Sequence, residues 1–581
     1  MTTLTRDMIL VTLFGALAGL ACYAMFEWIT EIRGFDTLTL GASVFAACFF
    51  SAALTMTGPV SLLRSLAPAA GFGAAVTALV LWASLRFADA EQFVETVHPF
   101  GVIFVLFVIA LPFLITATAR DTSSRRYADL FDVSWGAVTR IIVSCAFTGL
   151  FWVLLFLSDA LLKLVGITVI ETLIDIDPAP TVITGAVFGL AIVVTHELSD
   201  MVSPQLILRL LRLLLPMITV VVTVFVVALP FRGLSNLFGS LSAGAVMIGM
   251  AMTATSLVSA AIDRSSDQGV QRPWMRAFVQ VLACLVPVLG GLAIAAVWVR
   301  VQDYGWTPDR LAAATIAGVI FVYGLVYAGS VLLKGDWAHR LRQSNIALAL
   351  GVAAILAIWL TPILNPQAIS ARWQMARFEA GEALEKLPIY EMTHKWGRAG
   401  AEQIARLNEE LETTGDTEGL SLIAKAQKAE NSYMFEMEAA EATNAQRAVE
   451  LDAALPVFPA NSALPSEVLP SSDHQISEIF NICLPDEENA EANCVLISVP
   501  ARDDQPAHFV LIAYLQEAQQ FMWTFPKDEA TDSIGPRQFI KLSEAAKRDL
   551  RAGVYTLGSP RWSSVQIGGE NVHPRPWARG R

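Results

Sequence analysis

The sequence predicts an all-α membrane protein with many spans and a soluble region at its C-terminal end. Hydrophobic residues make up 54% of the 581 positions and charged residues only 16%, which is too apolar for an ordinary soluble protein. The apolar residues gather in long runs up to about residue 364, whereas residues 366–581 have the composition of a soluble domain. We therefore expect a transmembrane helical domain over residues 1–365 and a soluble part after it.

About eleven segments are apolar over the roughly 20 residues that a membrane-spanning helix needs. They cover residues 8–28, 38–56, 70–87, 100–119, 141–165, 182–195, 208–231, 241–262, 278–299, 311–333 and 346–364. The sixth is the shortest, and every later loop would change sides if it did not cross. The first run contains Gly19-Leu20-Ala21-Cys22, which is similar to a lipoprotein cleavage box, but Gly19 stands where such a box has Leu. We therefore expect an uncleaved first helix.

Basic residues in the loops predict the orientation. The larger group on one side is Arg6, Arg64, Arg120, Arg125, Arg126, Arg140, Arg264, Arg272, Arg276, Lys334, Arg340 and Arg342. Because short cytoplasmic loops carry an excess of Lys and Arg, this side is predicted to be cytoplasmic. With an odd number of spans, the N-terminus is then cytoplasmic and the soluble part lies on the far side, which in a Gram-negative bacterium is the periplasm.

The soluble part is predicted to have three sections. Residues 366–455 are typical of a charged helical segment, with Ile404, Leu407 and Leu411 at helical spacing. Residues 456–474 contain several prolines and are expected to be an extended linker. Residues 475–581 are expected to form a small α+β domain, with strands at 476–482, 494–499, 508–515 and 521–525 and a helix near 537–551.

Most of the formal net charge of −13 belongs to the soluble part, which has about 20 basic and 32 acidic side chains. An acidic surface is repelled by phosphate, so nucleic-acid binding and docking on lipid through a basic patch are not expected. Cys483 and Cys494 are the only cysteines outside the apolar runs. We expect them to form a disulfide that closes a hairpin in an oxidising compartment, and two free thiols in a cytosolic domain are the alternative.

The most specific motif is the polar loop Arg-Val-Gln-Asp-Tyr-Gly-Trp-Thr-Pro-Asp-Arg between the ninth and tenth runs. Thr307 is suited to cap the next helix, with Pro308 at its first position and Asp309 in its first turn. Tyr304 and Trp306 suit a membrane interface. A structural turn is favoured over a binding surface. The candidate residues of this loop are Arg300, Asp303, Tyr304, Trp306, Asp309 and Arg310.

Several stretches carry a resemblance to a known family. They are Phe147-Thr148-Gly149-Leu150-Phe151-Trp152, Ala228-Leu229-Pro230-Phe231 with Gly233-Leu234, Tyr304-Gly305-Trp306-Thr307-Pro308-Asp309-Arg310, Asn345-Ile346-Ala347-Leu348, and Thr361-Pro362 with Ser370-Ala371-Arg372. In these stretches the chain resembles a bacterial inner-membrane family known as domain of unknown function 4153. Asn365-Pro366 stands where the family pattern leads us to expect Asp-Pro. The resemblance implies a polytopic inner-membrane protein and brings no known activity.

Two polar patterns lie in or beside the apolar runs. Asp159 and Lys163 are four residues apart, which places them on one helix face within ion-pair reach. An ionisable residue in a span is a functional hypothesis by default, but here the pair lies near the outer interface and a structural role is favoured. His196, Glu197 and Asp200 are similar to a His-Glu-x-x-His zinc motif with Asp as the second ligand. No third ligand is evident, so a polar helix end is favoured over a metal site.

Two pairs of glycines, Gly15 with Gly19 and Gly185 with Gly189, have the small-xxx-small spacing that permits close helix approach. They predict helix packing, either within one chain or between two chains. No catalytic triad, Cys/His pair or phosphate-binding loop is evident, so no cofactor is expected.

Three function classes remain open. The favoured one is a non-enzymatic envelope protein, embedded in the lipid bilayer, that senses the periplasm or binds an envelope protein partner through its C-terminal domain. A secondary transporter of a small solute is suggested by the number of spans and by the pair Asp159 and Lys163. A membrane-embedded enzyme acting on lipid-linked substrates is the third, with Glu27, Asp303 and Asp309 as its carboxylates. The sequence names neither a substrate nor an oligomeric state.

Overall fold

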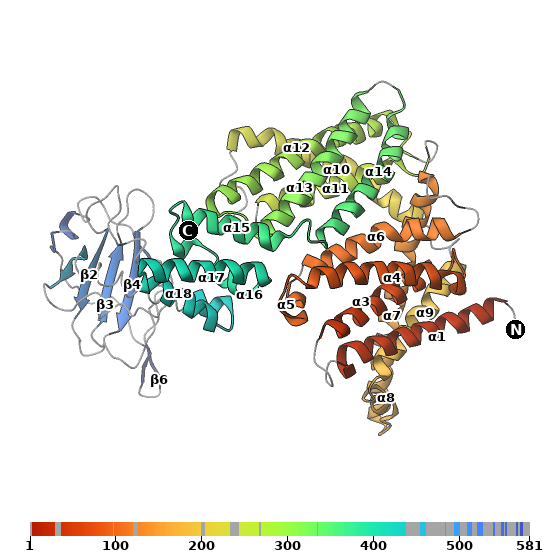
Figure 1. Cartoon of the computed structure of the whole chain (residues 1–581), viewed down its shortest axis with the longest axis horizontal. Coiled ribbons are helices and arrows are strands. Elements are labelled where there is room, and N and C mark those ends of the chain that lie inside the picture. The colour runs from red at the N-terminus through yellow and green to blue at the C-terminus, as the bar shows by residue number, and fades with distance from the viewer. Residues whose placement is uncertain are drawn as a thin grey trace. The chain divides into compact units, whose positions relative to one another are not determined.

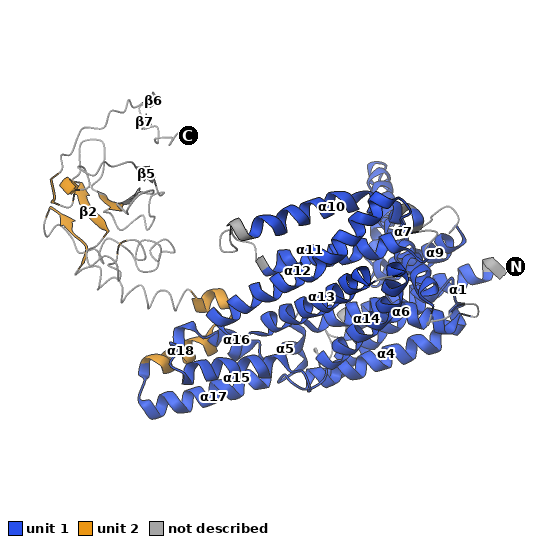
Figure 2. Cartoon of the chain, turned by 90° about the horizontal axis from the view of Figure 1, so that it is seen from above, with its two compact units in different colours: residues 1–417 blue, residues 418–581 orange. Residues whose placement is uncertain are grey.

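The structure is a computed structural model that describes residues 3–29, 36–96, 98–119, 122, 126–198, 204–232, 243–265, 269–333, 335–436, 454–459, 483, 493–499, 508–513, 520–526, 538–540, 548–550, 552–554, 565–567 and 570–572. The chain forms two compact units, residues 1–417 and residues 418–581 (Figure 2).

Within the described ranges, unit 1 contains eleven helices that are long and apolar enough to cross a membrane (Figure 1). They are α1 (Thr3–Tyr23), α3 (Thr37–Met56), α4 (Leu62–Ser84), α6 (His98–Thr118), α7 (Tyr127–Leu164), α9 (Ala179–Glu197), α10 (Pro204–Arg232), α11 (Ala243–Ile262), α12 (Pro273–Tyr304), α13 (Pro308–Leu332) and α14 (Trp337–Trp359). A π-helical segment (Ala24–Trp28) extends α1, and α5 (Ala90–Val94) and α8 (Val169–Ile174) are short helices between spans. The predicted multi-pass all-α bundle is confirmed.

Helix α7 begins at Tyr127, well before the apolar run that starts at residue 141. Its 38 residues span roughly 57 Å at 1.5 Å per residue, more than the hydrocarbon core of a bilayer. The polar first half is stabilised by contacts with neighbouring segments. Asp132 pairs with Arg264 at 2.8 Å, and the buried Arg140 donates to the carbonyl of Thr55 at 3.3 Å. A search for apolar runs alone does not detect the polar first part of this helix.

The apolar core of unit 1 has several parts. One packs α10 to α14 around the buried side chains of Val258, Val286 and Tyr327. Another packs α3, α4 and α6 around Val76 and Val80. Large apolar side chains also cover the outward faces of several spans, as on α7 and α10. Such surfaces are expected where lipid, instead of water, contacts the protein.

Three helices follow the last span and are called the extramembrane helices below: α15 (Pro366–Glu379), α16 (Ile389–His394) and α17 (Gly397–Thr414). A short 3-10 turn (Leu384–Lys386) separates the first two. The side chain of Asn365 accepts a hydrogen bond from the main-chain N–H of Ala368 and so caps α15. Asn therefore performs here the capping that the expected Asp would perform. In α17 the residues at helical spacing, Ile404, Leu407 and Leu411, are buried.

Unit 2 contains most of α18 (Thr417–Lys428) and a sheet with the order β1-β2-β3-β4-β5. Its strands are β1 (Val457–Phe458), β2 (Cys494–Val499), β3 (His508–Ala513), β4 (Gln520–Pro526) and β5 (Gln538–Ile540). Strand β1 pairs in parallel with β2, and the other neighbours are antiparallel. A separate hairpin joins β6 (Val565–Ile567) to β7 (Glu570–Val572).

Two expectations for unit 2 are corrected. The helix expected near 537–551 is wrong at its start, because residues 538–540 pair with β4 as a strand. The segment Gln-Phe-Ile contains an aromatic and a β-branched residue, both of which favour a strand. The expected linker over 456–474 begins with β1, which fills a place beside β2. The expected strand at 476–482 and residues 460–474 lie outside the described residues.

Candidate functional site at the extramembrane helices

The polar loop between α12 and α13 is closed by its own side chains. Gly305 ends α12 with a φ of 72°, a conformation that favours glycine. The Thr307 hydroxyl accepts a hydrogen bond from the Arg310 N–H at 3.3 Å, which makes Thr307 the helix cap that the Thr-Pro-Asp pattern predicts. The Arg310 guanidinium donates to the carbonyls of Tyr304 and Gly305 at 3.1 and 2.8 Å. Arg310 is therefore a structural group of the loop.

Helix α15 is hydrogen-bonded to the same loop. The Gln374 side chain, which is fully buried, donates to the carbonyls of Tyr304 and Trp306, each at 3.0 Å. A Cβ atom on Gly305 would lie 2.7 Å from the Gln374 amide nitrogen. Glycine therefore serves both the backbone conformation and the close approach of α15.

Arg377 adds a third hydrogen bond between α15 and the loop. It donates to the Asp303 carbonyl at 3.0 Å and pairs with Glu382 at 3.0 Å. Lys386 also pairs with Glu382, at 2.9 Å. The Lys386 ammonium, and after it the Arg377 guanidinium, hold the pKa of Glu382 below its usual range. The loop therefore contributes main-chain carbonyls to this contact, and the extramembrane helices contribute the donors.

The exposed side of the loop carries charges and aromatic rings. The Arg310 and Arg300 guanidinium groups lie 5.4 and 6.0 Å from the centre of the Tyr304 ring. Asp309 meets His98 at the start of α6, with Oδ1 and Nε2 2.5 Å apart. Sequence reasoning missed His98, which is more than 200 residues away in the chain.

The extramembrane helices make a second set of hydrogen bonds, to the turn between α4 and α5. Arg86 donates to the carbonyls of Trp359 and Thr361 at the end of α14. The main-chain N–H and the side-chain Nε of Arg398 donate to the carbonyls of Arg86 and Phe87, each at 2.9 Å. One extramembrane segment is thus hydrogen-bonded to the ends of two separate groups of spans.

Between these elements lies a pocket of about 360 Å³, called the arginine pocket below. The residues that line it include three arginines, Arg86, Arg372 and Arg398, and one acidic residue, Glu402. Burial lowers the pKa of Arg86 to about 10, which leaves it protonated at neutral pH. Its Nε atom is buried and has no hydrogen-bond partner among the residues that the structure describes. Sequence reasoning did not find this pocket, because its arginines come from distant parts of the chain.

The comparison with known families adds one finding. A family profile described as Domain of unknown function (DUF4153) matches residues 40–393, more than half of the chain. The chain belongs to this family. The matched part of this DUF4153 protein runs from α3 to α16 and includes the polar loop, Arg86 and Gln374. No curated protein and no solved structure matches the chain.

The pair Asp159 and Lys163 forms at the end of α7 in this DUF4153 protein. The Lys163 ammonium is 2.9 Å from Asp159 and 3.0 Å from Glu171 of α8. Asp159 is buried, whereas Lys163 is partly exposed. Lys163 therefore links α7 to α8 through an ion pair with Glu171. Sequence reasoning missed Glu171 as a partner.

The weak metal candidates lie at the end of α9. His196 packs against Gly58, where an added Cβ would lie 2.7 Å from the imidazole Cγ. Glu197 is the last residue of the helix, and Asp200 lies outside the described residues. Within the described part of the chain, no group of three or more His, Cys, Asp or Glu side chains is placed to hold a metal ion.

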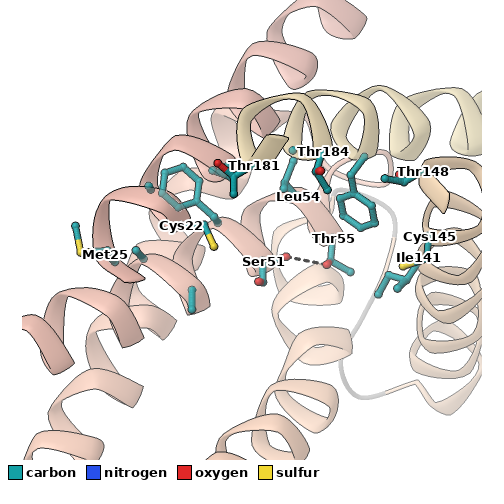
Figure 3. Close-up of a pocket in the computed structure, with 18 of the residues that line it drawn as sticks. Cys22, Met25, Ser51, Leu54, Thr55, Ile141, Cys145, Thr148, Thr181 and Thr184 are labelled. Carbon is teal, nitrogen blue, oxygen red and sulfur yellow. Dashed lines mark hydrogen bonds between the residues drawn. The ribbon is translucent and has the colours of Figure 1, made fainter. Parts of the chain in front are cut away.

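A larger cavity, of about 830 Å³, lies among α1, α3, α6, α7 and α9 of this DUF4153 protein. Figure 3 shows Cys22 and Met25 on one side of it and Cys145 and Thr148 on the other. Several lining hydroxyls donate to carbonyls three or four residues earlier, namely those of Thr55, Thr148, Thr181 and Thr184. These hydroxyls are thereby satisfied, and the cavity suits an apolar molecule or segment.

In unit 2, Cys483 and Cys494 are joined by a disulfide, with their Cα atoms 5.0 Å apart. Both side chains are fully buried. The disulfide anchors residue 483 at the start of β2, where the main-chain N–H of Asn493 also donates to the Cys483 carbonyl at 3.3 Å.

Proposed function

We propose that this DUF4153 protein is a non-enzymatic sensing protein of the bacterial inner membrane that binds an envelope protein through its C-terminal part. The observation that carries the proposal is the double attachment of the extramembrane helices. Gln374 and Arg377 hold the loop between α12 and α13, and Arg398 holds the turn after α4. A partner that displaced these helices would displace the ends of two groups of spans, which is the coupling that a sensor needs.

We further propose that the N-terminus is cytoplasmic and the C-terminal part periplasmic. Arg126, Arg264, Arg272 and Arg276 lie at the end of the spans opposite to the extramembrane helices, in keeping with the charge bias of cytoplasmic loops. The disulfide between Cys483 and Cys494 supports an oxidising compartment for unit 2. Thiol labelling in intact cells tests this orientation. Labelling of unit 2 by an impermeant reagent only after reduction is expected, and labelling only after lysis would reverse the orientation.

Capture of the partner tests the sensing role. The full-length protein is cross-linked in cells and purified, next to a variant that lacks residues 456–581. We expect an envelope protein that is captured by the full chain and lost from the truncated one. Unchanged capture would contradict binding through the C-terminal part. A Gln374→Ala variant separates partner binding from the coupling between the extramembrane helices and the spans. It should still capture the partner, but partner binding should no longer affect the spans.

A second candidate function is transport of an apolar or amphipathic solute, favoured by the cavity among α1, α3, α6, α7 and α9. Movement of a fluorescent phosphatidylglycerol across proteoliposome membranes tests it. A Cys145→Trp substitution would fill part of the cavity and should slow the movement, whereas Asp159→Asn should not, because Asp159 is outside the lining. Equal rates for the Cys145→Trp variant and the original protein would count against this candidate.

A further inference from the structure

We propose that the arginine pocket binds the phosphate of an anionic lipid headgroup. This site is separate from the partner-binding role proposed above, so either proposal can fail without the other.

The charge balance of the pocket favours an anion. Three arginines, Arg86, Arg372 and Arg398, are among the residues that line it, with one acidic residue, Glu402. Glu402 is already paired with Arg406 at 3.2 Å. Among the described residues, the ion pairs leave the three lining arginines without a carboxylate partner. An anion bound here would therefore meet uncompensated positive charge.

The donors are also preorganised. The main-chain carbonyls of Trp359 and Thr361 orient Arg86, and the carbonyl of Phe87 orients Arg398. Within the described part of the chain, the buried Nε atom of Arg86 has no hydrogen-bond partner. Guanidinium groups present their N–H donors in a planar fork that matches phosphate oxygens. Arg372, by contrast, is exposed and can close over a bound anion.

The position of the pocket favours a lipid over a free ion. Trp82 and Leu85 line it at the end of the α4 span, and their side chains are 49% and 63% exposed. Tryptophan is enriched where the hydrocarbon core meets the headgroups. The pocket thus combines an apolar edge with cationic donors. Its volume of about 360 Å³ is within the range of small-ligand sites.

A local cluster of arginines can bind an anionic lipid even where the net charge of the surrounding segment is negative. The acidic balance of residues 366–581 argued against docking on lipid through a basic patch. The fold gathers two arginines of that segment next to Arg86, from the other end of the chain, and so creates a local positive site that a charge count does not reveal.

Lipid binding by the purified full-length protein in detergent tests the proposal. The probes are short-chain phosphatidylglycerol, short-chain phosphatidylcholine and inorganic phosphate. We expect phosphatidylglycerol to bind more tightly than phosphatidylcholine. Arg372→Gln should weaken its binding by roughly fivefold, the effect of about one basic residue at a membrane surface. Glu402→Gln should strengthen it, because a negative charge leaves the pocket.

Lys386→Gln is the matched control, since Lys386 is an exposed cation of the same segment outside the pocket lining. It should leave binding unchanged. Equal affinities of the original protein and Arg372→Gln would overturn the proposal, as would equal losses in Arg372→Gln and Lys386→Gln. If inorganic phosphate displaced phosphatidylglycerol at equal concentration, the site would bind free phosphate and the lipid assignment would be wrong.

Discussion

The main chains of Gly15 in α1 and Gly185 in α9 lie in direct contact, so that a Cβ atom on Gly15 would be 2.2 Å from the Gly185 carbonyl oxygen. A Cβ atom on Gly19 would lie equally close to the Thr181 carbonyl oxygen, at 2.1 Å. The small-xxx-small pattern therefore packs two helices of one chain, which decides between the two arrangements that the sequence allowed.

We predict that Gly185→Leu destabilises the protein strongly, because no rotamer can avoid the backbone of α1. Overpacking in a well-packed core lowers the free energy of unfolding by roughly 1–3 kcal/mol. Because the added side chain meets main-chain atoms, we expect a loss of about 3 kcal/mol or more for this variant. Gly149→Leu is the control, since nothing lies within 4 Å of a Cβ atom at that position of α7. Thermal unfolding in detergent measures both variants. Similar melting temperatures for the two would show that α1 and α9 do not pack through this contact.

The contact between α15 and the polar loop at Gly305 can be compared with Gly381, a glycine that lacks such a contact. Gly305 and Gly381 both have positive φ angles, of 72° and 97°, but only Gly305 lies against Gln374. Alanine at either site meets a positive-φ conformation that costs roughly 1–3 kcal/mol, and Gly305, with a ψ of 179°, lies in a region open almost only to glycine. Gly305→Ala should lose more stability than Gly381→Ala, because its backbone conformation excludes alanine and because a Cβ atom there also displaces Gln374. Unfolding curves of the two variants measure the difference, and equal losses would argue against the contact.

Buried hydrogen bonds at Tyr327 are expected to stabilise the core of α10 to α14. Its side chain is fully buried, and its hydroxyl lies 2.9 Å from the Ser259 hydroxyl and 2.8 Å from the Asn345 side-chain oxygen. Tyr327→Phe should lower the free energy of unfolding by about 1–3 kcal/mol, since it leaves buried polar partners unsatisfied. Tyr323→Phe, one helical turn away and only partly buried, should have a smaller effect. The reverse order in unfolding experiments would contradict this assignment.

The ion pairs of Glu382 predict a pH dependence. Lys386 and Arg377 lower the pKa of Glu382 from its ordinary value of 4.5. A carboxylate with a lowered pKa in the folded state contributes stability above the ordinary value and loses it as the pH falls through the lowered value. Glu382→Gln should therefore melt at a lower temperature than the original protein at pH 7. The difference should shrink below pH 4.5, and a difference that persists in acid would exclude the ion pairs as its cause.

Much of the architecture follows from the sequence alone. Hydrophobic length and the scarcity of charges determine eleven spans, because a bilayer requires each crossing segment to be apolar and to satisfy its own backbone hydrogen bonds. The helix cap at Thr307 and the glycines that permit close helix packing can also be predicted from the sequence, since each depends on a local pattern. Short motifs such as the polar loop also identify the family.

Only the tertiary structure decides the contacts between distant segments. Residue spacing cannot reveal that Arg86 meets Arg398, that His98 meets Asp309 or that Gln374 holds the loop before α13. These contacts depend on which span ends lie side by side, and any apolar helix satisfies the membrane equally well in many arrangements. The sequence by itself therefore determined the spans and their local caps. The folded structure decided the arginine pocket, because its charge comes from residues that approach one another only when the bundle is assembled.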